Sequence, residues 1–288
     1  MRTWGRCHPR RGRAADEGPA RERRLEAPGP QGGKGGPPGL TLLLLLFVSL
    51  VQPRLLLAQR PTPEVEGQEL AAELRAQYPV EDLATSGTLK TRVGDGPWQV
   101  VPVKMRVVLG ARDWTTVYET SGNERTPAER LIVRHALDQP TQYRDARAPA
   151  AGAMLPAPLA LTTAEADRSF AGTAFWLTDL GLEFFQWPGQ RLVKREMRKG
   201  RACRVLESIN PQPASGHYAR VLSWIDLETT RLLRAEAYDG QGRMLKEFSV
   251  RSLKKVEGRW QLKAMEIRNA KTDARTRVEF DLELPAGK

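Results

Sequence analysis

The chain has 288 residues, of which 40% are hydrophobic and 27% are charged, and its formal net charge at pH 7 is +11. Most of this charge lies near the N-terminus, because residues 61–288 carry 34 Lys and Arg against 30 Asp and Glu, a net charge of +4. Basic and acidic residues are interleaved there, which excludes the one-signed stripe of charge that is typical of a nucleic-acid-binding protein.

The N-terminal part of the chain divides into two segments. Residues 1–39 are rich in Gly and Pro and have no apolar periodicity, which predicts a disordered basic leader. Residues 40–59 begin with LTLLLLLFVSLV, a run too short to span roughly 30 Å of hydrocarbon as a helix but typical of a signal peptide. We therefore expect an exported, periplasmic protein, which stays at the inner membrane if this segment is not cleaved.

The residues after the apolar run begin with a helical pattern and continue with strands. Apolar residues recur with helical spacing over 61–79, and Pro79 ends the pattern. Runs rich in β-branched and aromatic residues, separated by Gly-containing turns, predict strands over 86–93, 98–109, 113–121 and 129–137.

The middle of the chain holds the remaining helical segments. Residues 144–160 are rich in Ala and Pro and have no period, which predicts a long connection, a kind of loop that is often functional. Thr162 and Glu165 have the spacing of a capping box and predict a short helix over 161–170. The aromatic segment 175–188 is expected to be a second helical segment that packs against a large apolar surface.

The C-terminal part of the chain has the pattern of a meander. Short turns separate predicted strands over 191–198, 201–209, 217–226, 231–239, 243–253, 259–269 and 275–284. Because no helix separates neighbouring strands, they form an antiparallel sheet with one apolar face. The predicted fold class is α+β: a strongly curved antiparallel sheet whose few short helices cover an apolar cavity.

The stretch YDGQG over 238–242 allows two interpretations, a phosphate-binding loop or a hairpin turn. The phosphate loop needs a third Gly and a following helix, whereas position 245 is Leu and the next residues alternate as in a strand. Asp239-Gly240 is itself a common hairpin sequence. The stretch therefore predicts a turn with no chemistry of its own.

Few residues have a pattern that supports catalysis or metal binding. Beyond residue 60 the sequence has His135, His217 and Cys203, and these do not form a metal-ligand spacing. Cys203 is either a reactive thiol, a partner in a disulfide between molecules or, as we expect, a small apolar side chain inside the sheet. Asp179 and Glu183 are either paired acids or, as we expect, the solvated face of a helix. The sequence therefore predicts no enzyme and no cofactor.

Two stretches of the C-terminal meander resemble a known family. WIDLETTRLLRAEAYDGQGRMLKEF and KKVEGRWQLKAMEIRNAKTDARTRVEF are similar to the LolA-like outer-membrane lipoprotein-sorting proteins. The matching positions are Trp224, Ile225, Asp226, Glu236, Tyr238, Asp239, Gly242, Lys246, Gly258, Trp260, Met265, Glu266 and Thr276. The resemblance is clearest over residues 170–284 and extends to 65–145 in strand rhythm. It implies one domain over 61–288, an incomplete β-barrel wrapped around helices, with a hydrophobic cavity for acyl chains and no catalytic residues.

Candidate cavity residues follow from the strand parity and from the aromatic segment. They are Val103, Met105, Val107, Phe175, Trp176, Phe184, Phe185, Leu222, Trp224, Val278, Phe280 and Leu282. Each is either a cavity residue or an ordinary core residue.

The function expected from these features is that of a periplasmic, non-catalytic carrier or binding protein, acting as a monomer in outer-membrane lipoprotein sorting. Its expected partners are lipoprotein acyl chains or another lipid, together with a membrane transport complex, and no nucleic acid. Two alternatives remain. In the first, the protein uses the same fold as an envelope sensor or scaffold that binds a protein partner, and in the second it is a lipid-processing enzyme.

Overall fold

The computed structural model describes residues 60–124, 126–137, 139–256 and 258–282. The predicted leader (1–39) and the whole predicted signal segment (40–59) lie outside the described residues, so both stay predictions. Among the described helices, none is both long enough and apolar enough to cross a membrane.

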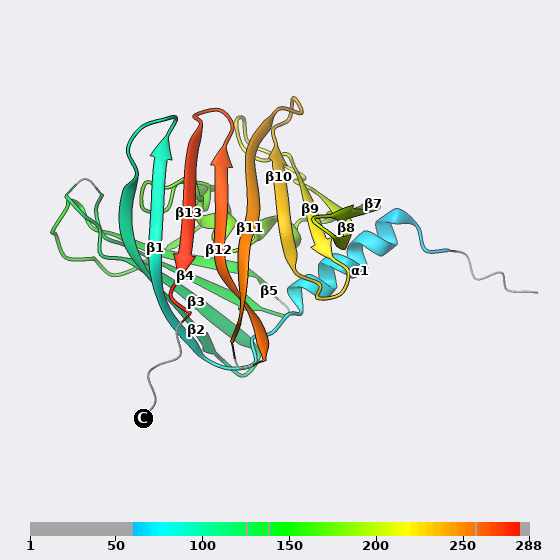
Figure 1. Cartoon of the computed structure of the whole chain (residues 1–288), viewed down its shortest axis with the longest axis horizontal. Helices are drawn as coiled ribbons and strands as arrows, with labels where there is room; N and C mark the ends of the chain where they lie inside the picture. The colour runs from blue at the N-terminus through cyan, green and yellow to red at the C-terminus, as the bar shows by residue number, and fades with distance from the viewer. Residues whose placement is uncertain (1–59, 125, 138, 257, 283–288) are drawn as a thin grey trace, which may run out of the picture. The chain divides into compact units, whose positions relative to one another are not determined.

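One antiparallel sheet of thirteen strands makes up most of the described chain (Figure 1). Its strands are β1 (Leu83–Val93), β2 (Gln99–Leu109), β3 (Asp113–Thr120), β4 (Glu129–Ala136), β5 (Gln139–Arg147), β6 (Leu159–Leu161), β7 (Gly189–Arg198), β8 (Arg201–Ile209), β9 (Arg220–Asp226), β10 (Leu232–Tyr238), β11 (Met244–Val256), β12 (Arg259–Asn269) and β13 (Ala274–Phe280). The helices are α1 (Pro63–Arg75), α2 (Thr163–Ala166), α3 (Leu177–Leu180) and the 3-10 helix η1 (Glu183–Gln186).

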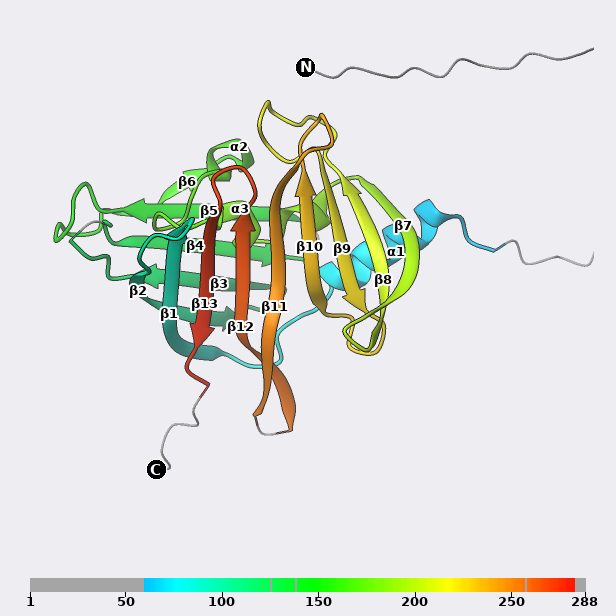
Figure 2. The same ribbon diagram turned by 45° about the horizontal axis from the view of Figure 1, so that its top comes forward.

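The order of the strands brings the first strand and the last strand together. Across the sheet the order is β6-β5-β4-β3-β2-β1-β13-β12-β11-β10-β9-β8-β7. The first strand pairs with the last, so that Gly87 lies opposite Phe280 and Val93 opposite Ala274. Strands β2 to β5 pass behind β1, β13 and β12 in both views, so the sheet curves over a concave inner face (Figure 2). β6 and β7 form its two edges, and the predicted curved, open antiparallel sheet is confirmed.

Helix α1 packs on the part of the sheet that β7 and β8 form. Thr62 caps its N-terminus, since the hydroxyl accepts a hydrogen bond from the backbone amide three residues later at 3.3 Å. Gly67, Leu70 and Ala71 form its buried face. A Cβ atom at Gly67 would lie 2.5 Å from the backbone of Arg191, so this close approach to β7 requires glycine.

The chain between β6 and β7, residues 162–188, crosses the inner face of the sheet and carries α2, α3 and η1; we call it the crossing segment. It begins with the predicted capping box. The Thr162 hydroxyl accepts from the Glu165 amide at 3.3 Å, and the Glu165 carboxylate accepts from the Thr162 amide at 2.8 Å. This confirms the short helix that the Thr162 and Glu165 spacing predicts.

The apolar core on the inner face consists of two main clusters. The first cluster joins the β1, β2 and β13 region to the start of the crossing segment and includes Leu89, Val101, Leu131, Phe170, Phe175 and Val278. The second cluster joins α1 to β7–β10 and includes Leu70, Phe184, Phe185, Leu206, Val221 and Ile225. Phe248 of β11 packs against both clusters.

Arg168 ties the crossing segment to β4 and β5 through two buried carboxylates. Its guanidinium donates to Glu129 at 2.9 Å and also to Asp145. The side chain of Glu129 is 0% exposed and that of Asp145 is 5% exposed. Glu129 accepts the Ala171 amide as well, at 2.8 Å. Burial raises the pKa of both carboxyls, so the guanidinium compensates charges that would otherwise be costly in this position.

The prediction of a long connection over 144–160 is wrong at both ends. Residues 144–147 belong to β5, and residues 159–161 form β6. The sequence does not predict β5 because QPTQYRDAR is polar and begins with Gln-Pro. Thr141, Tyr143 and Asp145 are nevertheless buried, and pairing with β4 occupies the backbone hydrogen-bonding groups. The aromatic segment 175–188 likewise contains two single-turn helices, α3 and η1, instead of one longer helix.

The stretch over 238–242 is the predicted hairpin turn between β10 and β11. Gly242 has a φ of +76°, and its amide donates to the Asp239 carbonyl at 3.0 Å. The Asp239 carboxylate accepts the amides of Gln241 and Arg243, each at 2.9 Å. The turn thus uses its amides to stabilise its own backbone, and the prediction of a hairpin turn is confirmed.

Candidate functional site

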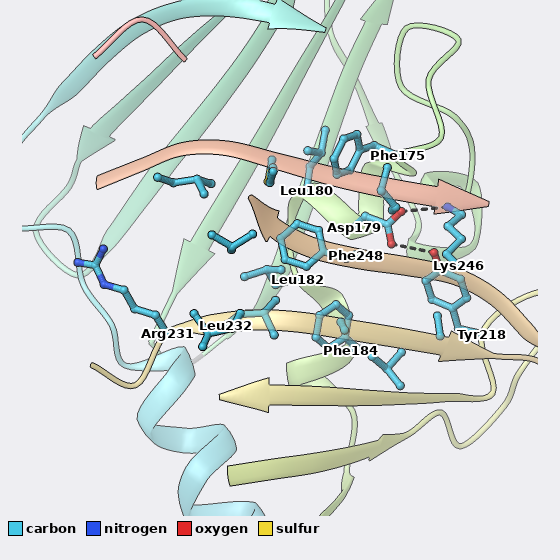
Figure 3. A pocket seen from close by; sticks show the side chains of 18 of the residues that line it. Phe175, Asp179, Leu180, Leu182, Phe184, Tyr218, Arg231, Leu232, Lys246 and Phe248 are labelled. Carbon is cyan, nitrogen blue, oxygen red and sulfur yellow. Dashed lines mark hydrogen bonds and ion pairs between the residues drawn. The ribbon is translucent and has the colours of Figure 1, made fainter. Parts of the chain in front are cut away.

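An apolar cavity of about 250 Å³ lies between the two clusters, on the inner face of β9–β12. Figure 3 shows how side chains of the crossing segment and of the strands surround it. Its apolar walls include Phe175, Leu180, Leu182, Phe184, Leu232 and Phe248. Two small residues of β10, Ala235 and Ala237, also line it and leave space that larger side chains would fill.

The lining of the cavity distinguishes it more than its size does. Two other hollows have similar volumes, about 280 and 270 Å³, and each has three charged side chains in a wall of only a few residues. The wall of the 250 Å³ cavity consists mainly of apolar side chains. A ligand that covers this wall would remove apolar surface from water, which favours binding.

A buried ion pair, Lys246 with Asp179, lies at one end of the cavity, and Arg231 lies at the other (Figure 3). Nζ of Lys246 lies 2.9 Å from Oδ2 of Asp179, and the two side chains are 2% and 11% exposed. Tyr218 donates its hydroxyl to Oδ1 of the same carboxylate at 2.9 Å. The ammonium also lies over the ring of Trp176, with 3.6 Å between Nζ and the ring centroid.

The charge of Lys246 is balanced inside the protein. Burial lowers the pKa of Lys246 to about 8, although the Asp179 carboxylate opposes this shift. At neutral pH the ammonium therefore keeps its charge, and Asp179 compensates it. This end of the cavity thus offers hydrogen-bonding groups without a net charge.

A second group of buried polar side chains lies beside this ion pair. Tyr143 donates its hydroxyl to Glu183 at 2.8 Å, and burial raises the pKa of Glu183 to about 7. Thr178 donates to Asp167 at 2.6 Å, and Nδ1 of His217 lies 2.9 Å from the same carboxylate. These contacts join the crossing segment to β5 and to the residues that precede β9.

The expectation that Asp179 and Glu183 form a solvated helix face is wrong, because Glu183 is buried and the Asp179 side chain is only 11% exposed. The crossing segment lies across the inner face of the sheet, so its short helices turn these acids toward the core. Each acid has its own partner, Lys246 for Asp179 and Tyr143 for Glu183. Across the described ranges, no three His, Cys, Asp or Glu side chains are arranged to hold a metal ion.

The predicted cavity residues of the aromatic segment all lie at or beside the cavity. Phe175 and Phe184 line it directly. Trp176 and Phe185 pack in the second cluster next to it, and Trp176 lies against Lys246. The aromatic segment is therefore the part of the prediction that the structure places nearest the cavity.

The predicted cavity residues of the strands lie elsewhere. Val103, Val278, Phe280 and Leu282 are buried within the first cluster, Met105 packs against it, and Val107 is half-buried on the same strand. Leu222 and Trp224 pack with Cys203 in a separate group, because Val221 and Ile225 carry the inward parity of β9. Cys203 is buried as expected, and desolvation raises its pKa.

Several cavity-lining residues are not among the sequence candidates, including Phe248, Met265 and Ile267. Phe248 lies on β11, and the other two lie on β12. The alternation of apolar and polar residues on these strands identifies them as inward-facing. Which inward-facing residues meet a cavity and which meet packed side chains depends on the path of the crossing segment, which strand parity does not contain.

Comparisons with known proteins bear on the fold. A family model described as "Uncharacterized protein" matches residues 155–282. No curated protein matches the sequence. Among solved structures, a DUF1329 family protein from Desulfovibrio piger has a TM-score of 0.62 and 18% identity, over 79% of this chain and 95% of that chain.

Two further solved structures are similar in fold to this chain. A putative outer membrane lipoprotein-sorting protein domain from Vibrio parahaemolyticus has a TM-score of 0.59 and 18% identity, over 77% of this chain and 94% of its own. A LolA superfamily protein from Nitrosomonas europaea has a TM-score of 0.52 and 15% identity, over 78% and 96%. At these identities the similarity is one of fold.

Proposed function

We propose, from the LolA-like fold of this chain and the cavity between its two clusters, that the protein is a non-catalytic carrier or binding protein for lipoproteins or another lipid. In this role the cavity holds acyl chains. The observation that supports the proposal most is the apolar cavity of about 250 Å³. One similar solved structure is described as a putative outer membrane lipoprotein-sorting protein domain, which supports the same class of ligand. The predicted signal segment supports an exported, periplasmic location.

The walls of the cavity suit a hydrocarbon chain better than a polar ligand. Phe175, Phe184 and Phe248 offer flat apolar surfaces, and Met265 adds a flexible side chain that adapts to irregular shapes. Each buried methylene of an acyl chain would contribute about 0.8 kcal/mol. A void of about 150 Å³ is large enough to bind benzene, so this larger one is large enough for part of an acyl chain.

The polar groups beside the cavity support binding more than catalysis. Lys246, Asp179 and Tyr218 bind one another, so the carboxylate and the ammonium satisfy each other inside the protein. Such a pair can hydrogen-bond to a ligand, but neither group is poised to act as a free acid or base. This arrangement agrees with a carrier that releases its ligand unchanged.

Uptake of an environment-sensitive fluorescent acyl probe by the delipidated protein tests the proposal. Wild-type protein should bind the probe in a saturable way. Ala237→Phe places a larger side chain in the cavity and should weaken binding at least about tenfold, which corresponds to about 1.4 kcal/mol. Ala202→Phe makes the same change at an exposed position of β8 and should bind like the wild type.

Two outcomes would contradict the proposal: no uptake by the wild-type protein, or equal uptake by both variants while each unfolds cooperatively. A protein partner that co-purifies in stoichiometric amount, with no lipid present, would instead favour the sensor or scaffold alternative. Mass spectrometry of the purified protein distinguishes these cases.

A further inference from the structure

The cavity adjoins a second hollow at the end where Arg231 lies. This hollow has a volume of about 280 Å³ and shares Arg231, Val250 and Leu253 with the cavity. Figure 3 shows Arg231 at the end of the cavity away from the Lys246 and Asp179 pair. Because Arg231 is exposed, a ligand can enter from solvent at this end.

The second hollow is strongly basic, and we call it the arginine hollow. Arg201, Arg231 and Arg251 line it. Its other lining residues are Thr229, Val250, Ser252, Leu253 and Trp260. Among the residues that the structure describes, no acidic side chain lines this hollow. A surface with this composition attracts anions, because one guanidinium group can donate two parallel hydrogen bonds to the oxygens of a carboxylate or phosphate.

The three arginines differ in the partners that they already have. Arg201 donates to Asp226 at 3.0 Å and to Glu228 at 3.2 Å, so its charge is compensated. Arg231 donates to the backbone carbonyl of Trp260. Among the described residues, no carboxylate forms an ion pair with Arg231 or Arg251. These two guanidinium groups therefore have donors to offer to a ligand.

The two ends of the cavity differ in net charge. At the inner end, Asp179 compensates Lys246, so an anionic group placed there would meet an existing carboxylate. At the outer end, Arg231 lines both the cavity and the hollow beyond it, where it lies with Arg251, and neither has an ion-pair partner among the described residues. An elongated ligand with one anionic group would consequently lie with that group in the arginine hollow and with its apolar chain pointing toward Lys246.

We propose that the ligand of the cavity is an anionic amphiphile, whose phosphate or carboxylate head binds Arg231 and Arg251 while its hydrocarbon chain occupies the cavity. The inference rests on the proposed function, since it requires that the cavity hold an acyl chain. It goes further in naming the charge of the head group and the residues that select it. Trp260, which is 49% exposed and lines the same hollow, covers the junction between head and chain.

Competition between ligands of equal chain length tests the inference. Dodecanoate, dodecyl phosphate, dodecanol and dodecyltrimethylammonium are each titrated, below the concentrations at which they form micelles, against the fluorescent acyl probe on delipidated protein. The two anions should bind at least about tenfold more tightly than dodecanol, and the cation more weakly than dodecanol. Because the arginine hollow is open to water, the preference for anions should shrink in 0.5 M salt.

Substitutions at the arginine hollow separate the head group from the chain. Arg231→Gln combined with Arg251→Gln should reduce the preference for anions to about twofold or less and leave dodecanol binding unchanged. Arg106→Gln, at an exposed position of β2 that lines neither the cavity nor the hollow, is the matched control. All three replaced side chains are exposed, and thermal unfolding of each variant verifies that the fold is kept.

The outcomes distinguish this inference from the proposed function. Dodecanol that binds as tightly as dodecanoate, or a preference that survives in the double variant, overturns the inference and leaves acyl binding intact. Failure of all four ligands to bind overturns both. Inorganic phosphate alone should not displace the probe; phosphate that binds as tightly as dodecyl phosphate would show an anion site independent of the cavity and would also overturn the inference.

Discussion

Replacing Asp179 with Asn should destabilise the protein by an amount that depends on pH through Lys246. Nζ of Lys246 lies 2.9 Å from Asp179, and the lysine side chain is 2% exposed. The variant therefore removes the counter-charge that keeps this buried lysine protonated, so desolvation leaves the lysine neutral in the folded protein. Asn keeps the size of the side chain and a carbonyl acceptor for Tyr218, so the effect on packing is small.

The magnitude follows from the pKa of Lys246, which burial lowers from 10.5 to about 8. Because pH 7 is about one unit below this pKa, the charged form of Lys246 is more stable than the neutral form by about 1.4 kcal/mol in the folded wild-type protein. Without Asp179, the folded protein holds the lysine neutral and loses this stabilisation. We expect the free energy of unfolding to fall by about 1.4 kcal/mol at pH 7 and by about 2.7 kcal/mol at pH 6, since each pH unit adds about 1.4 kcal/mol.

The difference between the two proteins should vanish above about pH 9. Lys246 is then neutral in both folded proteins, whereas lysine in the unfolded chain stays protonated up to about pH 10.5. Between pH 8 and 10.5 the unfolded state of the wild-type protein binds more protons than the folded state. The stability contributed by this site to the wild-type protein therefore rises with pH in this range.

Urea unfolding followed by circular dichroism at pH 6, 7, 8 and 9 measures these free energies. The control is the same Asp179→Asn change made in a Lys246→Met background, where the loss should not grow toward low pH. A loss for Asp179→Asn that is equal at pH 6 and pH 9, or larger at pH 9, would refute the reasoning.

Three further changes probe the groups that hold the fold. Burial raises the pKa of Glu183 from 4.5 to about 7, so the stability that this group contributes should fall as pH rises from 4.5 to 7. In urea unfolding, this group should make the wild-type protein about 3 kcal/mol less stable at pH 7 than at pH 4.5, and Glu183→Gln should abolish that difference. Arg168→Met removes the cation between two buried carboxyls and should cost up to about 3 kcal/mol at pH 7; the loss should be smaller at pH 5, because the pKa values of both carboxyls are raised. Gly67→Ala should lower the Tm despite a gain of about 1 kcal/mol in helix propensity, since its Cβ would lie 2.5 Å from the backbone of Arg191; a higher Tm would disprove the close approach.

The sequence by itself determined the elements and the kind of sheet that they form. Alternation of apolar and polar residues predicts nearly all of the strands, and short turns such as Asp239–Gly242 require neighbouring strands to be antiparallel. The capping box at Thr162 and Glu165 likewise needs only residues that are close in sequence. These features depend on local geometry, and local geometry is what a pattern of residues contains.

Only the tertiary structure decided where the site lies. The pairing of β1 with β13 and the path of the crossing segment join residues far apart in sequence, and these contacts decide which inward-facing side chains are packed. They bury Asp179 beside Lys246 and leave a cavity next to Phe248 instead of next to Phe280. A cavity is the place where side chains from several elements fail to fill space, so no single strand or helix contains the information that locates it.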